Sequence, residues 1–310
     1  MWDKKHLLGL EELSAQDITE LLDKAGDYRA TALDDDKACD ALRGKRVVLM
    51  FFENSTRTRV SFEVAAERLG GSVTALSMDT SSVKKGESLL DTVRTIDSMG
   101  VDFMVVRHSS SGAARQVAKA VSASVINAGD GTHEHPTQGL LDMLTVRQHK
   151  GRIDGLRVGI VGDVLHSRVA RSNLFGLKKL GASVVLIGPP TLVPDSFRSL
   201  GAEISNNFDD VIHQCDVLNM LRIQRERLDG QYFPSVREYC ELFRLDSSRM
   251  RRAKPDVLVM HPGPMNRGIE ITPDVADGAN SVILEQVSNG VAVRMAVLDT
   301  LNKAMMNDEG

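Results

Sequence analysis

A run of hydroxyl and guanidinium side chains is the part of this chain best suited to chemistry. It consists of Ser55, Thr56, Arg57, Thr58 and Arg59. The run follows an apolar stretch that is typical of a buried strand, 46–50, and precedes apolar residues at helical spacing, 60–69. The first turn of a helix has backbone N–H groups without intrahelical partners and roughly half a positive charge, and hydroxyl and guanidinium groups add donors that suit phosphate oxygens. The run therefore predicts a phosphate-binding turn.

An alternative is that Ser55 only caps the helix and that both arginines are solvated, since capping serines are common. The order hydroxyl, hydroxyl, arginine, hydroxyl directly after a buried strand favours the anion site. It is not the common nucleotide loop, because the glycines and the lysine of that motif are absent from this stretch.

Two further candidates stand where strands are expected to end. Strand 102–108 would place Arg107 at its carboxyl end, the edge at which ligands gather in open α/β sheets. His135 follows the expected strand 124–128 and precedes Pro136, which suits the first position of a helix. The positive end of that helix would favour a neutral imidazole, which can donate a hydrogen bond to a carbonyl oxygen. Structural capping by His135 alone stays open.

A metal site is a weaker alternative in the same stretch. His133 and His135 form a His-X-His pair, but no further ligand stands beside them at a metal-binding spacing. The expected strand 156–161 is not followed by the Gly-X-Gly-X-X-Gly fingerprint of a dinucleotide site, so NAD is not expected. The sequence thus predicts neither a metal nor a cofactor.

Strands and helices alternate along the chain in a way that predicts two domains. Four strand-to-helix units fall within about a hundred residues before Gly151, which is typical of a parallel, doubly wound sheet. A long apolar-faced helix at 285–305 would return to the first domain. We therefore expect an α/β protein with two doubly wound domains, each with a central, mostly parallel sheet flanked by helices. Their bounds are 1–150, with 286–310 returning to it, and 151–285.

The second domain carries its own polar groups where strands are expected to end. Arg168 stands at the start of the helix after the first strand, and Arg222 and Gln224 follow the expected strand 216–220. A solvated charged loop is the alternative for Arg222 and Gln224. The turn 261–264 has two prolines around one glycine, which makes a rigid turn at the same edge of the sheet.

Composition limits the partners and the compartment. The net charge of −4 and the pI near 6.1 argue against nucleic acid, which requires a basic face. Cys39, Cys215 and Cys240 are far apart and in no metal-ligand spacing, which suits a reduced, cytoplasmic protein. The residues after Met1 lead into no long apolar segment, so we expect neither a signal peptide nor a membrane span.

Four motifs together resemble the carbamoyltransferase family. They are Ser55-Thr56-Arg57-Thr58-Arg59, Lys84-Lys85-Gly86-Glu87, His135-Pro136-Thr137-Gln138 and His261-Pro262-Gly263-Pro264. The match runs in order over nearly the whole chain. Arg222-X-Gln224-X-Glu226-Arg227 and the turn at Arg168 resemble the branch of the family that uses aspartate. The resemblance implies transfer of the carbamoyl group of carbamoyl phosphate to the amine of L-aspartate, an early step of pyrimidine synthesis.

The resemblance also implies a role for each candidate. The phosphate would be held by Ser55, Thr56, Arg57 and Thr58. The carbamoyl oxygen would be polarised by Thr58, Arg107 and His135, and the carbamoyl amide bound by Gln138. Aspartate would be held by Lys85, Arg168, Arg222, Gln224, Gly263 and Pro264, with the Gly263–Pro264 bond expected to be cis. The family forms homotrimers with shared sites, so Ser81 and Lys85 would be donated to the neighbouring subunit, and Lys85 and Arg57 would complete the catalytic set.

Two other functions fit parts of this pattern. Ornithine carbamoyltransferases share the phosphate half, but carry His-Cys-Leu-Pro where this chain has His-Pro-Gly-Pro at 261–264. A catalytically silent, carbamoyltransferase-like scaffold subunit is the second alternative, and the presence of every expected site residue argues against it. A regulatory chain or a dihydroorotase bound to the trimer stays open, whereas nucleic acid and membrane partners are not expected.

Overall fold

The computed structural model describes residues 2–33, 39–77, 88–223 and 235–308. The chain divides into two compact units, which are Met1–Leu141 with Val287–Gly310 (unit 1) and Asp142–Gln286 (unit 2). Helix α5 (Pro136–Lys150) and helix α11 (Ile283–Asp308) run across the divisions between them. The expected boundary at 150/151 is the end of this same helix α5.

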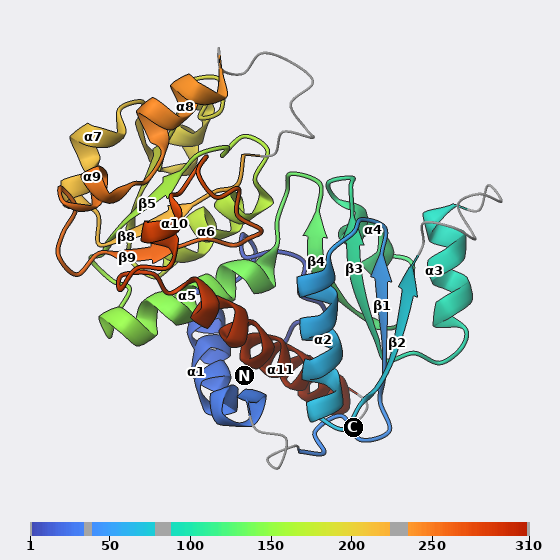
Figure 1. Ribbon diagram of the computed structural model, residues 1–310. Helices are drawn as coiled ribbons and strands as arrows, with labels where there is room; N and C mark the ends of the chain where they lie inside the picture. The colour runs from blue at the N-terminus through green and yellow to red at the C-terminus, as the bar shows by residue number, and fades with distance from the viewer. Residues whose placement is uncertain (1, 34–38, 78–87, 224–234, 309–310) are drawn as a thin grey trace. The chain divides into compact units, whose positions relative to one another are not determined.

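Unit 1 contains a four-stranded sheet in which every ladder is parallel (Figure 1). Its strands, in chain order, are β1 (Arg46–Phe51), β2 (Ser72–Ser77), β3 (Phe103–His108) and β4 (Ser124–Asp130). The spatial order is β2-β1-β3-β4, so the chain leaves β1 toward one side and returns on the other. In such sheets, ligands bind where the strand order reverses, which here lies between β1 and β3.

Helices cover both faces of this sheet, as the alternation of side chains along each strand requires. Val48 and Met50 of β1 point into one core with buried residues of α3 (Leu89–Asp97) and α4 (Ala113–Ala118). Helix α2 (Thr56–Arg68) packs on β1 and β2, and buries Phe62, Ala65 and Ala66.

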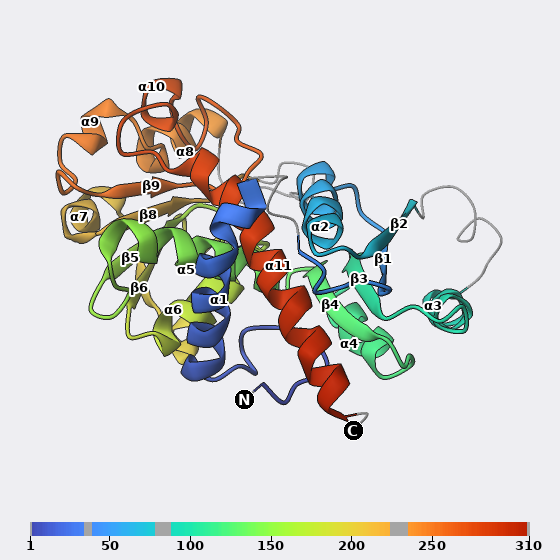
Figure 2. The ribbon, with the colours of Figure 1, turned by 90° about the horizontal axis from the view of Figure 1, so that it is seen from below.

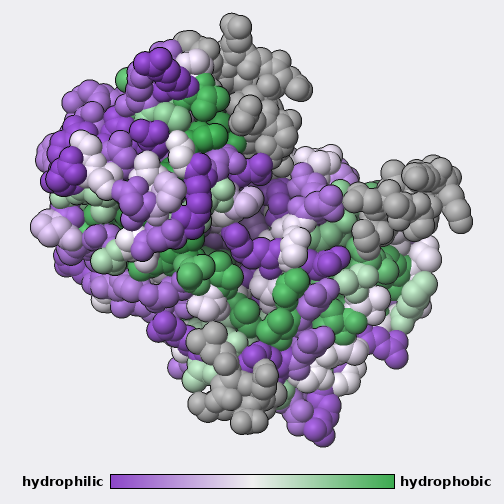
Figure 3. All heavy atoms as spheres, viewed as in Figure 1, coloured by the Kyte–Doolittle hydropathy of each residue, from purple (hydrophilic) through white to green (hydrophobic). Residues whose placement is uncertain are grey.

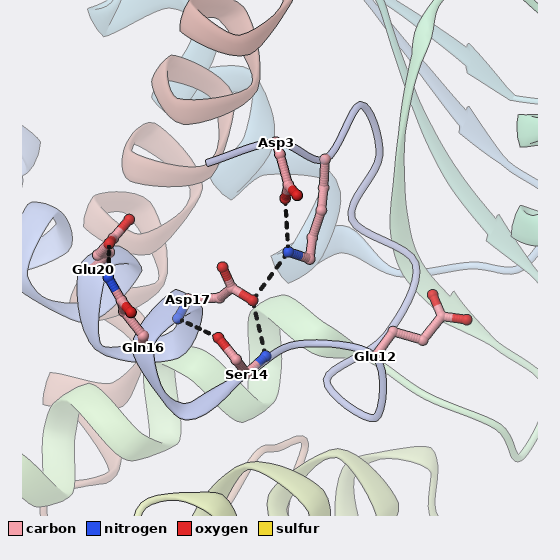
Figure 4. Close-up of a pocket in the computed structure, with 7 residues that line it drawn as sticks. Asp3, Glu12, Ser14, Gln16, Asp17 and Glu20 are labelled. Carbon is pink, nitrogen blue, oxygen red and sulfur yellow. Dashed lines mark hydrogen bonds and ion pairs between the residues drawn. The ribbon is translucent and has the colours of Figure 1, made fainter. Parts of the chain in front are cut away.

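Helix α1 (Ala15–Leu33) begins with a capping box. The Ser14 N–H donates to Asp17 Oδ2 at 2.8 Å, and the Asp17 N–H donates to Ser14 Oγ at 3.0 Å. Figure 4 shows the polar pocket around this cap, where Lys4 Nζ contacts Asp3 at 2.9 Å and Asp17 at 3.1 Å. The pocket is lined by more acidic than basic groups, so it does not suit an anion.

The C-terminal helix packs on the first unit, as predicted. Asp299 of α11 accepts from Lys24 Nζ at 2.8 Å and from Tyr28 Oη at 2.9 Å, and both partners belong to α1. Figures 1 and 2 show α1 and α11 side by side in both views. Most of α11 therefore belongs to the core of unit 1, although the sequence places it after unit 2.

Unit 2 contains a second parallel sheet, with the spatial order β7-β6-β5-β8-β9. Its strands are β5 (Arg157–Val161), β6 (Ser183–Ile187), β7 (Glu203–Ser205), β8 (Val217–Met220) and β9 (Leu258–Met260). Its helices include α6 (Arg168–Lys179), α7 (Phe208–Val211), α8 (Val236–Phe243), α9 (Ser247–Met250) and α10 (Pro273–Ala276). The face of unit 2 seen in Figure 3 is mainly hydrophilic. One buried apolar cluster of this unit contains Val161, Val185, Leu218 and Tyr239. Both doubly wound sheets are thus confirmed.

Three details differ from the sequence interpretation. Strand β9 begins at Leu258 rather than at 256, and the three-residue β7 and the amphipathic α8 were not expected. Short elements of this kind carry too few periodic positions to stand out in a sequence. No helix within the described ranges is long and apolar enough to cross a membrane.

Candidate functional site

The phosphate-type turn lies where the sequence predicts it, between β1 and the first turn of α2. Ser55 occupies the N-cap position, but its side chain makes no capping hydrogen bond. Ser55 thus has the position of a cap, while its hydroxyl does not make the hydrogen bond of one. Thr58 is buried on the inner side of α2, whereas Arg57 is exposed. Desolvation of its partly covered guanidinium group lowers the pKa of Arg57.

The sheet register brings Arg107 to this turn. Phe51, the last residue of β1, pairs with Arg107 of β3, and the Phe52 N–H donates to the Arg107 carbonyl at 2.9 Å. The guanidinium of Arg107 is held from two sides, because Nη1 donates to the Ala128 carbonyl at 3.2 Å and Nε lies 3.6 Å from Glu53 Oε2. Arg107 is therefore fixed at the edge where the strand order reverses.

His135 and Gln138 reach the same edge from β4. The Gly131 N–H donates to the His108 carbonyl at 2.9 Å, which fixes the start of the β4–α5 loop next to the end of β3. His135 precedes α5 directly, and its carbonyl accepts from the Gln138 N–H at 3.0 Å. His135 is 4% exposed and Gln138 is 7% exposed, so both side chains are largely shielded from water.

The neighbouring His133 faces carboxylates rather than His135. Its Nδ1 lies 3.1 Å from Asp130 Oδ1, and this hydrogen bond raises the pKa of His133. Glu134 is fully buried and accepts the Leu10 N–H at 2.8 Å. Glu11, His133 and Glu134 place one ligand atom each within 4.8 Å of one another, so the sequence reading missed Glu11 as a spatial neighbour. Because Glu134 already holds backbone N–H groups, a purely structural role accounts for this cluster.

In unit 2, the pairing of strands also brings the predicted basic site residues to one edge of the sheet. Val161 of β5 pairs with Met220 of β8, and the Leu221 N–H donates to the Val161 carbonyl at 2.8 Å, which places Arg222 beside the turn after β5. That turn leads to α6, where Ser167 accepts the Ala170 N–H at 3.1 Å. Arg168 is the first residue of α6 and is 7% exposed.

The turn after β9 lies beside Arg222 and has a cis Gly263–Pro264 bond, as expected. Its position is fixed by Asn266 Nδ2, which donates to the Ile223 carbonyl at 3.2 Å. Gly263 has φ +66°, a conformation that favours glycine over residues with a side chain.

A buried histidine and a carboxylate support this turn. The Gly263 N–H donates to His261 Nδ1 at 2.8 Å, so the ring proton lies on Nε2, which is 3.1 Å from Glu270 Oε1. Glu270 also accepts the Asn266 N–H at 2.5 Å, and His261 and Glu270 are 1% and 0% exposed. The sequence reading did not assign a role to Glu270.

Asp142, on α5, connects this helix to three other elements. It is 2% exposed and accepts from Gln286 Nε2 at 2.9 Å, Asn173 Nδ2 at 2.7 Å and Asn219 Nδ2 at 3.2 Å. Gln286 in turn accepts the His261 N–H at 2.9 Å through Oε1. The network ties α5, α6, β8 and α11 to the base of the turn after β9.

Three predicted site residues lie outside the described part of the chain. They are Ser81, Lys85 and Gln224. The described structure thus brings Ser55, Arg107 and His135 to one edge of unit 1, and Arg168, Arg222 and Pro264 to one edge of unit 2. Chemically, the first set can bind a phosphate and donate to a carbonyl oxygen. The second can bind carboxylates. No base with an adjacent nucleophile is among the described site residues.

Comparison with protein families accounts for almost the whole chain. The carbamoyl-phosphate-binding domain of aspartate/ornithine carbamoyltransferases matches residues 5–148. The aspartate/ornithine-binding domain of the same proteins matches residues 154–301.

Individual proteins give the same picture. The chain is 54% identical to the aspartate carbamoyltransferase catalytic subunit of Bradyrhizobium diazoefficiens over 98% of this chain and 96% of that protein. It is 53% identical to that of Syntrophotalea carbinolica, over 96% of this chain and 95% of that protein. Aspartate transcarbamoylase of Trypanosoma cruzi with carbamoyl phosphate and aspartate has a TM-score of 0.86 at 32% identity, covering 95% and 96% of the two chains. Ornithine carbamoyltransferase of Pyrococcus furiosus has a TM-score of 0.83 at 31% identity, covering 94% of this chain and 95% of that chain. The fold alone therefore does not separate the two activities.

Proposed function

The chain belongs to the aspartate/ornithine carbamoyltransferase family, and we propose from this that it transfers the carbamoyl group of carbamoyl phosphate to the amine of L-aspartate. Relatives with 51–54% identity over nearly their full length carry the name aspartate carbamoyltransferase catalytic subunit. The product would be N-carbamoyl-L-aspartate, which belongs to pyrimidine synthesis. The observation that carries the proposal is the pairing of Phe51 with Arg107, because it unites the phosphate turn and the carbonyl donors at one edge.

Carbamoyl phosphate is assigned to the edge of unit 1. Ser55, Thr56, Arg57 and Thr58 hold the phosphate at the positive end of α2. Arg107 and His135 donate to the carbamoyl oxygen, together with Thr58. The ion pair of Arg107 with Glu53 and its hydrogen bond to the Ala128 carbonyl support this role, since a donor that is already oriented costs no reorganisation during the reaction.

The reaction needs charge stabilisation more than a protein base. The neutral amine of aspartate attacks the carbamoyl carbon, a C–N bond forms, and negative charge develops on the oxygen that faces the donors. The C–O bond to phosphate then breaks, and phosphate leaves with the electron pair and accepts the amine proton. Holding two anions in contact supplies a further part of the acceleration.

Aspartate is assigned to Arg168, Arg222 and the turn at Pro264 in unit 2. Two arginines match two carboxylates, because a guanidinium group can bind a carboxylate through two parallel hydrogen bonds. Gln224 and Lys85 complete this set in the proposal. Ornithine has a side-chain cation in place of the second carboxylate, so a second arginine would disfavour it.

We further propose a cytoplasmic homotrimer in which Ser81 and Lys85 act in the site of the neighbouring subunit. The three cysteines form no disulfide in the described structure, which supports a reducing compartment. The trimer is tested by mixing Arg57→Ala and Lys85→Ala chains, since hybrid trimers would regain partial activity. Mixed trimers of confirmed native mass that remain inactive would refute shared sites.

One assay tests the activity itself. The protein is supplied with carbamoyl phosphate and either aspartate or ornithine, and phosphate and the carbamoylated product are quantified. We expect turnover with aspartate. Turnover with ornithine alone would replace the proposal by the ornithine activity, and a folded protein inactive with both would support the silent scaffold.

A further inference from the structure

Arg294 is a buried cation in unit 1 that the proposed reaction does not use. It lies on α11 and is 3% exposed. Its Nη1 donates to the Gly290 carbonyl at 2.7 Å, and its guanidinium carbon lies 4.9 Å from the ring centroid of Phe62. Within the described ranges, no carboxylate forms an ion pair with Arg294, and its buried Nε has no hydrogen-bond partner.

The site around Arg294 is shaped to hold it. A Cβ atom built on Gly290 would lie 2.5 Å from Arg294 Nη1, so the glycine leaves the space that the guanidinium fills. Phe62 offers the face of its ring, which attracts a cation. An unpaired charge in such a place normally costs several kcal/mol, and an apolar side chain of similar volume is often more stable there. Arg294 therefore needs a compensation that the described protein groups do not supply.

The position of α2 indicates which group can compensate the charge of Arg294. Thr58 and Phe62 lie one turn apart on the buried side of this helix, so Arg294, which stacks on Phe62, lies next to the turn that follows the N-terminal turn. Burial, together with the nearby charge of Arg57, lowers the pKa of Arg294 to about 9, so Arg294 remains cationic at neutral pH and repels Arg57. The positive end of the helix dipole adds to the same excess of charge. An anion at the first turn would neutralise all three.

We propose that Arg294 is a positioning residue for the substrate phosphate, a buried charge whose counter-ion is the phosphate bound at the first turn of α2. It acts through space and does not touch the ligand. The inference rests on the proposed function for the identity of the site. It adds that the ligand-free protein keeps an uncompensated charge that binding relieves.

The test uses inorganic phosphate as the probe and the full chain at low ionic strength. In Arg294→Met, we expect the dissociation constant for phosphate to rise on the order of tenfold, as expected for one charge acting through an effective dielectric constant of about 20. We also expect the melting temperature of the ligand-free protein to rise, because an unpaired buried charge is removed. A residue with only a structural role would not produce this combination.

Controls separate the charge from the packing. Arg294→Lys keeps the charge and should retain most of the phosphate affinity, whereas Arg294→Gln should lose it, and this pair decides the question if the methionine variant does not fold. Lys119→Met removes an exposed charge just after α4, at the opposite edge of the sheet from the phosphate turn, and should change neither quantity. Arg57→Met should abolish binding and thereby confirm the location of the probe.

Two results would overturn the proposal. One is a phosphate affinity in Arg294→Met and Arg294→Gln within about twofold of the parent, and the other is a fall in ligand-free stability in both variants. The experiment does not depend on aspartate. A parent protein that binds phosphate but transfers no carbamoyl group would therefore refute the proposed function alone.

Discussion

Replacing Glu270 by alanine tests how the turn after β9 is held. Glu270 accepts the His261 Nε2–H at 3.1 Å and the Asn266 N–H at 2.5 Å, and it is fully buried. Without the carboxylate, both donors would be buried without a partner. Each such donor costs about 1–3 kcal/mol, so we expect the free energy of unfolding to fall by about 2–6 kcal/mol. That is a large share of the about 5–15 kcal/mol that stabilises a typical protein.

Glu270→Gln shows how much of the loss of unfolding free energy comes from the charge of Glu270. The glutamine oxygen can accept from both His261 and Asn266, so only the strength that the negative charge adds to these bonds is lost. The new amide group would stand where Glu270 Oε2 has no hydrogen-bond partner among the described residues. We therefore expect a smaller loss than for alanine, about 1–3 kcal/mol, from one buried donor without a partner.

The assay must report on unit 2. The single tryptophan of the chain is Trp2, in unit 1, so its fluorescence would follow the wrong unit. Urea unfolding followed by far-UV circular dichroism, with hydrogen exchange of peptides from β9 and α8, avoids this problem. The aspartate KM should rise in parallel, because the turn contains Pro264.

A surface carboxylate of unit 2 provides the matched control. Glu241 pairs with Arg237 at 3.0 Å on exposed helix α8, and such pairs contribute about 0.3–0.5 kcal/mol. Glu241→Ala should therefore leave stability and the aspartate KM nearly unchanged. If Glu270→Ala behaved like Glu241→Ala, or if Glu270→Gln were the less stable of the two Glu270 variants, the reasoning from buried donors would be refuted.

Two further predictions concern unit 1. Burial lowers the pKa of His6 to about 4, and its Nδ1 accepts the Val125 N–H at 3.0 Å, so the folded state favours the neutral ring. As the pH falls from 6.5 to 4, the unfolded protein binds the proton before the folded protein does. The free energy of unfolding should therefore drop over that window by about 1–2 kcal/mol after allowance for solvent screening. His6→Gln should flatten this part of the plot of stability against pH. In His135→Ala, loss of one donor to the carbamoyl oxygen should lower kcat about 10²–10³-fold while phosphate binding persists, and an unchanged kcat would remove His135 from the mechanism.

The sequence predicts the parts of the site that lie at strand ends. Ser55 and His135 follow strands, and Arg107 lies at the carboxyl end of one. Parallel strands bring their carboxyl ends to one edge regardless of the distance along the chain. The exact register, such as Phe51 opposite Arg107, requires knowledge of which strands are neighbours. Which strands are neighbours depends on how both faces of the sheet pack. The residue pattern of a single strand does not show this.

The groups that the sequence did not reveal are buried and non-local. Glu134 meets Leu10 and Glu11, and Asp142 meets Gln286, across sequence separations that no spacing rule covers. Arg294 did have a local signal, because it stands between Val293 and Met295 in an apolar part of a helix. A cation in such a stretch is costly unless something compensates it. The apolar periodicity of the helix does not distinguish such a cation from a solvated one.

The buried charged side chains of the two units differ in how they are compensated. In unit 2, Asp142 and Glu270 each accept several hydrogen bonds from their own chain, so their sites are compensated before any ligand arrives. In unit 1, Arg294 has one hydrogen bond, to the Gly290 carbonyl, but its Nε has no partner and no carboxylate pairs with it among the described residues, and it lies near a turn that is already positive. A bound anion stabilises the state that binds it, by about 2.7 kcal/mol at a hundred times its dissociation constant. The gain from phosphate should therefore appear in unit 1, around α2 and α11, while the network of unit 2 holds the turn after β9 in its conformation with or without substrate.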